Sequence, residues 1–310
     1  CNAKALSVDN IASVTKTYGD DVATGEVTFT DTLILLDDVE VTASIVSPVY
    51  STSGNLNAGT YSQITGSTAD LTGADAANYT LIATTEADSY TVNAKALSVD
   101  NIASVTKTYG DDVATGEVTF TDTLILLDDV EVTASIVSPV YSTSGNLNAG
   151  TYSQITGSTA DLTGADAANY TLIATTEADS YTVNAKALSV DNIASVTKTY
   201  GDDVATGEVT FTDTLILLDD VEVTASIVSP VYSTSGNLNA GTYSQITGST
   251  ADLTGADAAN YTLIATTEAD SYTVNAKALS VDNIASVTKT YGDDVATGRG
   301  HLHRYINPPR

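Results

Sequence analysis

Residues 39–45 read Val-Glu-Val-Thr-Ala-Ser-Ile, so apolar side chains fall on one face of an extended chain and polar side chains on the other. The same alternation, with a period of two, recurs at residues 4–9 and 26–30. This pattern is typical of antiparallel strands that bury one face and expose the other. It predicts an all-β fold, with further strands at residues 60–65, 79–84 and 89–93 and a less regular one at residues 11–16.

Segments rich in glycine, asparagine and aspartate separate the expected strands, at residues 18–21, 53–55, 57–59 and 72–75. These residue types tolerate the backbone dihedrals that tight turns require. Six or seven short strands at this spacing indicate a two-sheet sandwich. Residues 33–36, Leu-Ile-Leu-Leu, fit either a buried strand or one helical turn.

The whole pattern is repeated without change, because residues 2–92, 93–183 and 184–274 are identical blocks. A fourth copy begins at Asn275 and breaks off after Gly298. Repetition at a fixed period is typical of arrays whose units add length or valency. We therefore expect sandwich domains at residues 1–92, 93–183 and 184–274, followed by a truncated repeat at residues 275–298. No flexible linker separates the blocks, which predicts a rod.

One local motif sharpens the fold prediction. Residues 75–81 read Asp-Ala-Ala-Asn-Tyr-Thr-Leu and have the spacing of a tyrosine corner. In immunoglobulin-like sandwiches that tyrosine lies at the start of the penultimate strand, and its hydroxyl bonds to upstream backbone. We expect Tyr79 to take this structural role and Leu81 to point into the core. The predicted fold is a tandem array of immunoglobulin-like antiparallel β-sandwiches, elongated overall.

The last twelve residues, 299–310, read RGHLHRYINPPR and differ from the continuation of the earlier copies. One nucleotide inserted after the codon for Gly298 allows the codons of the repeat to encode this whole tail and then a stop. We interpret residues 299–310 as a frameshifted, non-native tail; a short basic anchor is the alternative. Both histidines and all three arginines lie there, so they do not indicate a site. Because no methionine precedes Cys1, we expect the chain to be a fragment.

The chain is strongly acidic, with a formal net charge of −28. Each complete repeat carries twelve acidic residues and two lysines. Such a surface repels nucleic acid and anionic membranes, because it offers few cations to replace phosphate counterions. No apolar run reaches the 18 or more residues of a membrane span. The sequence thus predicts neither nucleic-acid binding nor membrane insertion, and the charge is expected to keep neighbouring units soluble.

Several segments together resemble the YDG and MBG repeat domains. They are the opening Asn-Ala-Lys-Ala-Leu-Ser-Val, residues 16–20, residues 57–61, and above all residues 71–81 with the run GADAANYTL. This chain reads Tyr-Gly-Asp at residues 18–20 in place of Tyr-Asp-Gly, so the choice between the two domain types stays open. The resemblance implies a tandem β-sandwich array of bacterial surface and secreted proteins, including filamentous-haemagglutinin-like adhesins. It brings no catalytic residues.

Catalysis has little support in the repeats. They contain no histidine or cysteine, which excludes Ser-His-Asp and Cys-His chemistry there. The acidic pairs at residues 20–21 and 37–38 could in principle serve a glycosidase, but adjacent carboxylates in strands point to opposite faces. We therefore expect no enzyme and no cofactor.

Calcium is the sharper alternative, because turn carboxylates at the junctions between domains could supply its oxygen ligands. The candidate ligands are Asp70 and Asp75, which flank a turn, and Glu86 and Asp88, which we expect just before the final strand, near the junction with the next repeat. Solvated turn carboxylates are the preferred interpretation. The five tyrosines of each repeat offer a further choice between recognition and packing, of which packing is preferred.

The sequence favours a structural stalk or spacer of a bacterial cell-surface or secreted adhesin-like protein, whose partners are the neighbouring repeats of the same chain. The alternative is a multivalent module in which each repeat binds a glycan or a host-surface protein weakly and the array gains avidity.

Overall fold

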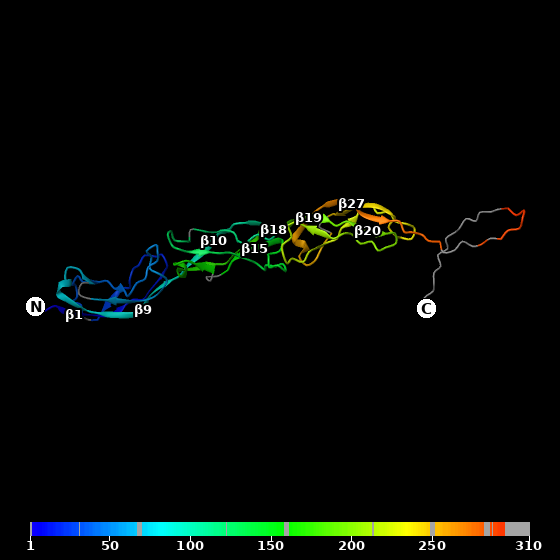
Figure 1. Cartoon of the computed structure of the whole chain (residues 1–310). Helices are drawn as coiled ribbons and strands as arrows, with labels where there is room; N and C mark the ends of the chain where they lie inside the picture. Colours follow the sequence, from blue (N-terminus) through cyan, green and yellow to red (C-terminus); the bar gives the residue numbers. More distant parts are fainter. Residues whose placement is uncertain are drawn as a thin grey trace, which may run out of the picture.

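The structure, a computed structural model, describes residues 2–30, 32–66, 70–121, 123–157, 161–212, 214–248, 252–281, 286 and 288–294. It is nearly all β, and three similar units follow one another along an extended string (Figure 1). The N-terminus lies at one end of the string. Within the described ranges no helix is long and apolar enough to cross a membrane. The predicted tail, residues 299–310, lies outside them.

The elements described in every repeat are nine strands and a short 3-10 helix directly before the eighth strand, in the same order. In repeat 1 they are β1 (Lys4–Ile11), β2 (Val14–Thr17), β3 (Val27–Phe29), β4 (Glu40–Val41), β5 (Ser44–Ile45), β6 (Gly59–Thr65), β7 (Leu71–Thr72), η2 (Ala76–Asn78), β8 (Tyr79–Ile82) and β9 (Thr84–Asn93). In repeat 2 they are β10 (Lys95–Ile102), β11 (Val105–Thr108), β12 (Val118–Phe120), β13 (Glu131–Val132), β14 (Ser135–Ile136), β15 (Gly150–Thr156), β16 (Leu162–Thr163), η4 (Ala167–Asn169), β17 (Tyr170–Ile173) and β18 (Thr175–Asn184). In repeat 3 they are β19 (Lys186–Ile193), β20 (Val196–Thr199), β21 (Val209–Phe211), β22 (Glu222–Val223), β23 (Ser226–Ile227), β24 (Gly241–Thr247), β25 (Leu253–Thr254), η6 (Ala258–Asn260), β26 (Tyr261–Ile264) and β27 (Thr266–Asn275).

The strands of each repeat form two larger sheets and one small one. In repeat 1 the orders are β3-β1-β8, β2-β9-β6-β5 and β4-β7, and the other repeats have the same orders. The prediction of purely antiparallel sheets is wrong, because β1 runs parallel to β8 and β2 runs parallel to β9. The other pairs are antiparallel.

The parallel pairs arise where the chain crosses between the two larger sheets. Only residues 12 and 13 separate β1 from β2, and only Ala83 separates β8 from β9. In both cases the first strand belongs to the sheet β3-β1-β8 and the second to the sheet β2-β9-β6-β5. The two crossings therefore lie side by side and run in the same direction. Alternation of apolar residues reports which face of a strand is buried, but it does not report the direction of the neighbouring strand.

A buried glutamine holds this crossing together. Gln63 on β6 is fully buried, and its Oε1 accepts a hydrogen bond from Gly25 N–H at 2.6 Å. Its Nε2 donates to the Ala12 carbonyl at 3.0 Å and to Ser89 Oγ at 3.0 Å. The side chain thus satisfies backbone groups of the β1–β2 crossing and of β9 in the interior, where an unpaired amide would be costly.

Most predicted strands are present, with different limits. Residues 60–65 lie in β6, residues 79–84 contain β8, and residues 89–93 are the end of the longer β9. The expected strand at residues 39–45 divides into β4 and β5, which belong to different sheets. Residues 4–9 lie in β1. Strand β2 begins and ends later than the stretch expected at 11–16, and β3 is shorter than the stretch expected at 26–30.

The predicted bond of Tyr79 to upstream backbone is present, but its partner lies 45 residues upstream and not in the adjacent turn, as it does in a tyrosine corner. Tyr79 is buried, and its hydroxyl accepts a hydrogen bond from the upstream backbone N–H of Ile34 at 3.1 Å. The same hydroxyl donates to Asp37 Oδ2 at 2.5 Å, which the sequence did not indicate. Leu81 lies in the same core cluster, as predicted. The corner therefore fixes the loop at residues 33–37 against the end of the repeat.

Residues 33–36 form neither a buried strand nor a helical turn. Leu33 packs against the core, but Leu35 and Leu36 are 87% and 94% exposed, and Leu36 has a positive φ of 79°. Both alternatives of the sequence interpretation are wrong here. The tyrosine corner holds the backbone in a turn, which leaves these leucines on the outside at one end of the repeat.

The hydrophobic core does not stop at the repeat boundaries. One cluster joins Tyr18, Leu56, Tyr90 and Val92 of repeat 1 to Leu97, Leu162, Tyr170 and Leu172 of repeat 2. The corresponding cluster joins repeats 2 and 3. The predicted boundaries at 92/93 and 183/184 lie at the end of β9 and β18, where a new strand begins two residues later. Neighbouring repeats thus share a core.

The described part of the fourth copy differs from the complete repeats. Residues 276–281, 286 and 288–294 contain no strand. Leu279 is 77% exposed, whereas its equivalents Leu6 and Leu97 are fully buried. These residues thus do not form the packing that the same sequence forms in repeats 1 and 2.

Candidate functional site: the joints between repeats

Each joint brings together two surfaces that recur in every repeat. The trailing face is the C-terminal end of a repeat and consists of Tyr18, Thr52, Asn57, Ala58 and their copies. The leading face is the N-terminal end of a repeat and consists of Ile34, Asp37, Asp75, Asn78, Tyr79 and their copies. In the first joint, the trailing face of repeat 1 contacts the leading face of repeat 2.

Two tyrosines and one carboxylate lie at the centre of the first joint. The rings of Tyr18 and Tyr170 meet edge to face, with centroids 5.4 Å apart. Tyr18 Oη donates to Asp128 Oδ2 at 2.7 Å, and Tyr170 Oη donates to the same oxygen at 2.5 Å. Burial, reinforced by the bond to Asp128, raises the pKa of Tyr170 far above its ordinary value. Both hydroxyls therefore stay protonated at neutral pH and act as donors.

A second carboxylate closes one side of the joint. Asp166, which is 3% exposed, accepts a hydrogen bond from Thr52 N–H at 3.2 Å and another from the Thr52 hydroxyl. Asp129 N–H donates to it at 2.9 Å. Burial opposes ionisation of this carboxyl, but the hydrogen bonds from Thr52 and Asp129 outweigh it and lower the pKa of Asp166. The Thr52 hydroxyl also contacts the Leu127 carbonyl, at 2.9 Å.

An asparagine side chain completes the polar contacts of the joint. Asn169 Oδ1 accepts a hydrogen bond from Ala58 N–H at 2.8 Å, and its Nδ2 donates to Asn57 Oδ1 at 3.0 Å. Asn169 belongs to η4, directly before the corner tyrosine. The motif at residues 75–81 thus fixes the corner within a repeat and, in its copies, also binds the preceding repeat.

Close approach at the joint requires a glycine. Gly19 has a positive φ of 90°, and a Cβ built on it would lie 2.5 Å from Cδ1 of Ile125 in the next repeat. Gly110 stands in the same relation to Ile216 at the second joint. Both features favour glycine, because an L side chain would strain the backbone and displace the isoleucine.

The second joint repeats the first. Tyr109 donates to Asp219 at 2.7 Å, and its ring lies 5.4 Å from that of Tyr261. Thr143 binds Asp257, and Ala149 N–H donates to Asn260 Oδ1 at 2.7 Å. The same contacts therefore connect repeats 1 and 2 and repeats 2 and 3.

The two ends of the array show what a missing neighbour changes. Asn78 on the leading face of repeat 1 is exposed, whereas its copies Asn169 and Asn260 are buried. Tyr200 on the trailing face of repeat 3 is only half-buried. Hydrogen bonds from Ser233 and Ser235 lower its pKa, whereas burial raises the pKa of Tyr18 and Tyr109. The burial of these side chains thus depends on the adjoining repeat.

The four candidate calcium ligands lie in different local settings. Asp70 Oδ2 accepts a hydrogen bond from Gly66 N–H, and Asp75 Oδ2 accepts one from Asp38 N–H. Glu86 and Asp88 lie inside β9, at a bulge opposite β6, and not before the final strand near the joint as expected. Among the described residues no group of three or more histidine, cysteine, aspartate or glutamate side chains could hold a metal ion. Calcium binding stays an alternative to the preferred solvated turns.

The tyrosines serve different purposes. Tyr18, Tyr79 and Tyr90 are buried and Tyr61 is half-buried, which agrees with the packing role preferred from the sequence. Tyr50 is 54% exposed. The sequence did not identify Tyr18, Thr52 or Asn78 as joint residues, because their partners lie about 110 residues away along the chain.

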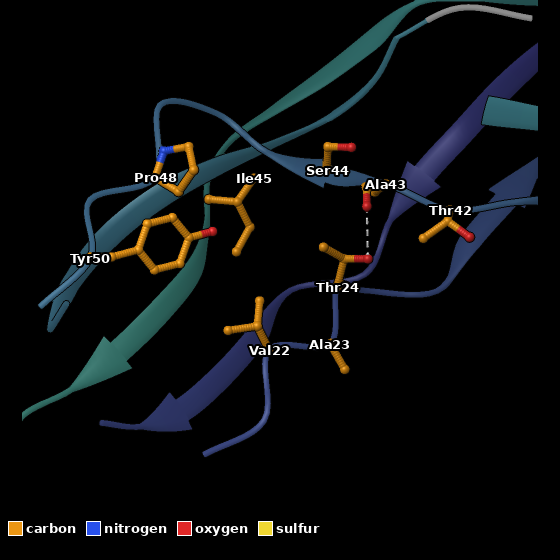
Figure 2. Close-up of a pocket in the computed structure, with 9 residues that line it drawn as sticks. All are labelled: Val22, Ala23, Thr24, Thr42, Ala43, Ser44, Ile45, Pro48 and Tyr50. Carbon is orange, nitrogen blue, oxygen red and sulfur yellow. Dashed lines mark hydrogen bonds between the residues drawn. The ribbon is translucent and has the colours of Figure 1, made fainter. Parts of the chain in front are cut away.

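Tyr50 borders a shallow groove of about 580 Å³. Residues 22–24 line one side of it, and residues 42–45, Pro48 and Tyr50 line the other. Figure 2 shows Ile45 and Tyr50 facing Val22 across this space, with the Thr24 hydroxyl bonded to the Ala43 carbonyl. The copies of Val22 and Tyr50 in repeats 2 and 3 are similarly exposed, so each repeat presents the same apolar surface.

Comparison of the chain with protein-family models finds no matching family, and comparison with curated proteins finds no match.

Proposed function

We propose that this chain is a non-catalytic stalk or spacer of a bacterial cell-surface or secreted adhesin-like protein. The observation that carries the proposal is the joint: two successive repeats share one core and a fixed set of hydrogen bonds, and the next pair repeats them. A chain that only strings binding domains together does not need such contacts. The proposed bacterial and extracellular setting comes from the resemblance to YDG and MBG domains.

The joint contacts favour a stiff string over a flexible one. Bending at the first joint would separate Tyr18 from Tyr170 and Asp128 and would uncover Asp166 and Asn169. Each hydrogen bond contributes about 1 kcal/mol net, and a buried group left without its partner costs about 1–3 kcal/mol. Opening a joint therefore costs several kcal/mol, so thermal bending there is rare.

We also propose that each repeat is an immunoglobulin-like sandwich. The two larger sheets, the corner tyrosine and the position of Leu81 in the core support this assignment. Pairing of β2 with β9 in parallel fits a first strand that crosses from one sheet to the other.

Small-angle scattering of the full chain tests the stalk. Three units of ordinary domain size, each adding on the order of 30–40 Å, give a maximum dimension of about 100 Å and a rod-like profile. Tyr109→Ala removes the central contact of the second joint and should broaden the distance distribution. Tyr200→Ala, the same change on an uncovered face, is the matched control and should not. A compact globule, or equal profiles for both variants, would contradict the stalk.

The groove beside Tyr50 favours a second candidate function, multivalent binding of a glycan or a host protein. One chain presents three copies of this exposed apolar surface, so weak binding of a multivalent ligand by each copy could give high overall avidity. A glycan array and a panel of host-surface proteins, probed with the full chain, test this. Binding that weakens further with each replacement of Tyr50, Tyr141 and Tyr232 by alanine would support this function. If the chain binds none of the probes, the stalk is the only candidate function left.

A further inference from the structure

Two shallow grooves occupy neighbouring positions of the repeated sequence. One is the groove beside Tyr50 in repeat 1, and the other, of about 560 Å³, lies in repeat 3. The residues that line the second groove are 206–209, Phe211 and 221–224, the copies of 24–27, Phe29 and 39–42. Both grooves include the positions of Thr24 and Thr42. Since the repeats have the same sequence and strands, the two form one continuous groove, named the edge groove, between residues 22–29 and residues 39–50 and their copies.

The walls of the edge groove contain strands with a neighbour on one side only. Among the described strands, β3 ends the sheet β3-β1-β8, β5 ends the sheet β2-β9-β6-β5, and β4 pairs with β7 alone. β3 lies in the first wall, and β4 and β5 lie in the second. The outer edge of such a strand presents backbone N–H and C=O groups that can pair with a further strand. The edge groove thus separates the open edges of different sheets.

On β3 the outward backbone groups belong to Val27 and Phe29. The Glu26 carbonyl and the Thr30 N–H form hydrogen bonds on the side of β1, at 2.8 Å and 3.1 Å. Backbone groups of successive residues in an antiparallel strand point alternately toward the partner strand and away from it. The N–H and C=O groups of Val27 and Phe29 therefore point away from β1, at the outer edge of the sheet.

At the edge of β5 the outward backbone groups belong to Ala43 and Ile45. Val46 N–H donates toward β6 at 2.9 Å, so the backbone groups of Ile45 point to the outer edge. The Ala43 carbonyl accepts a hydrogen bond from the Thr24 hydroxyl of the opposite wall at 3.0 Å (Figure 2). A side-chain hydroxyl thus takes the position that an N–H of a neighbouring strand would take. Pro48, which has no N–H, closes this edge a few residues further on.

The walls of the edge groove carry negative charge. Glu26 and Glu40 are exposed and belong to opposite walls, and their copies Glu208 and Glu222 line the groove of repeat 3. Neither wall segment contains a lysine or an arginine. A ligand with positive charge therefore complements this surface, whereas an anionic ligand is repelled.

We propose that the edge groove binds an extended, basic segment of another protein as an added strand. The segment pairs with the outward backbone groups of β3 and β5 and replaces the Thr24 hydroxyl at the Ala43 carbonyl. Side chains of a strand alternate between its two faces, so apolar side chains face the groove while lysine or arginine side chains face Glu26 and Glu40. Main-chain hydrogen bonds supply affinity in this mode of recognition, and the alternating side chains supply specificity.

This inference rests on the second candidate function, ligand binding by each repeat, and names the class of its ligand. The stalk does not depend on it. An extended segment of about eight residues matches the length of the first wall. Because the three repeats are identical, one chain has three equivalent sites.

Fluorescence anisotropy of the full chain with a labelled octapeptide of alternating lysine and valine tests the proposal. We expect saturable binding of three peptides per chain, weakened by salt because opposite charges attract. The same peptide with glutamate in place of lysine should not bind. N-methylation of alternate backbone nitrogens keeps the charge but removes N–H donors, so it should weaken binding at least tenfold. A dissociation constant above about 1 mM for the lysine peptide would overturn the proposal.

Neutral substitutions locate the site. Glu26→Gln together with Glu40→Gln, made in all three repeats, should weaken binding of the lysine peptide at least tenfold. The charge-matched control is Glu86→Gln together with Asp88→Asn in all three repeats, because both residues lie in β9, outside the walls, and asparagine tolerates the positive φ of 51° at Asp88. This control should bind nearly as the native chain does. Equal affinities of the two variants would show attraction by overall charge and refute a site in the edge groove.

Hydrogen exchange of the full chain separates strand addition from other binding in the groove. Bound peptide should slow exchange at the amides of Val27, Phe29 and Ile45, averaged over the three repeats. Binding that leaves these amides unprotected, or that N-methylation does not weaken, refutes strand addition but leaves ligand binding by the repeats in place. If the lysine peptide does not bind while a glycan binds in a manner that depends on Tyr50 and its copies, the inference fails and the second candidate function stands. If neither binds, both fail and the stalk is left.

Discussion

Removal of one hydroxyl at the second joint is the most direct probe of how much the joints stabilise the array. Tyr109 is buried, and its Oη donates to Asp219 Oδ2 at 2.7 Å. A hydrogen bond to a charged acceptor contributes about 1.5–3 kcal/mol. In Tyr109→Phe the Asp219 carboxylate still accepts the hydrogen bond from Tyr261 Oη to its Oδ2, at 2.5 Å, so it retains one tyrosine partner. We expect a loss of about 1.5–2 kcal/mol, at the lower end of that range.

The matched control is Tyr200→Phe, which removes the same hydroxyl from the same local sequence. Tyr200 contacts the serines of its own repeat, with Ser235 Oγ at 3.5 Å, and no carboxylate of the described residues accepts a hydrogen bond from it. Thermal unfolding of the full chain, followed by circular dichroism, should show a fall of a few degrees for Tyr109→Phe and no measurable change for Tyr200→Phe. Tyr18→Phe should match Tyr109→Phe, since Tyr18 bonds Asp128 at the same distance. Equal shifts for Tyr109→Phe and Tyr200→Phe would refute the inference that the joint is a stabilising interface.

Four further predictions follow from single features. Tyr79→Phe removes the corner bond to Ile34 and Asp37 and should lower the melting temperature of repeat 1 by a few degrees; an unchanged melt would contradict the structural role of the corner. Gly110→Ala should destabilise more than Gly201→Ala, because both have a positive φ but only the first adds a contact with Ile216; the difference, about 1–3 kcal/mol, is measurable by urea unfolding. The pKa of Tyr109 is raised from 10.0 by burial, so its stabilising effect is complete below pH 10 and is lost as the pH rises above it; the melting temperature should fall less steeply between pH 9 and about pH 11 in Tyr109→Phe than in the native chain. Calcium should raise the melting temperature no more than sodium chloride of equal ionic strength; a calcium-specific rise of several degrees that Asp70→Asn or Asp75→Asn abolishes would overturn the preference for solvated turns.

Acid should weaken the joints through Asp166 and Asp257. Hydrogen bonds hold the pKa of both carboxyls below their ordinary value of 3.8 despite burial. A carboxyl whose pKa is lower in the folded chain stabilises it above the ordinary pKa and loses that effect as the pH falls below it. This acid sensitivity belongs to the joints, because Thr52 and Thr143 of the preceding repeats donate hydrogen bonds to these two carboxyls.

The sequence predicted what depends on local patterns. Alternation located β6 and β8, and the spacing around Tyr79 predicted its bond to upstream backbone and the buried position of Leu81. The strands and the buried position of Leu81 need only the order of residues within a few positions, whereas the partner of Tyr79, Ile34, lies 45 residues upstream and was not predicted. The parallel pairing of β1 with β8 was missed, because it depends on where the chain crosses between sheets, and no local pattern encodes that direction.

The joints were missed for a different reason. Thr52 lies in a turn and Asn78 ends the short 3-10 helix η2, and the local chain conformation already accounts for both residue types. Their binding role appears only when the copy of Asn78 in the next repeat, Asn169, lies against Ala58. Exact repetition also hid the signal: every copy carries both faces, so no difference between copies separates joint residues from residues that fold the unit.

Exact repetition has a physical consequence that follows from those two faces. A joint is stable only if a trailing face meets the leading face that fits it, and each repeat carries one of each. Copying a whole unit therefore copies both halves of the joint, and the added unit fits its neighbours on both sides without any further change. A substitution in one face of one copy, in contrast, disturbs a single joint and leaves the others intact. Growth by duplication of complete units thus lengthens this array while preserving every interface within it, whereas gradual divergence of the copies would weaken the joints one by one.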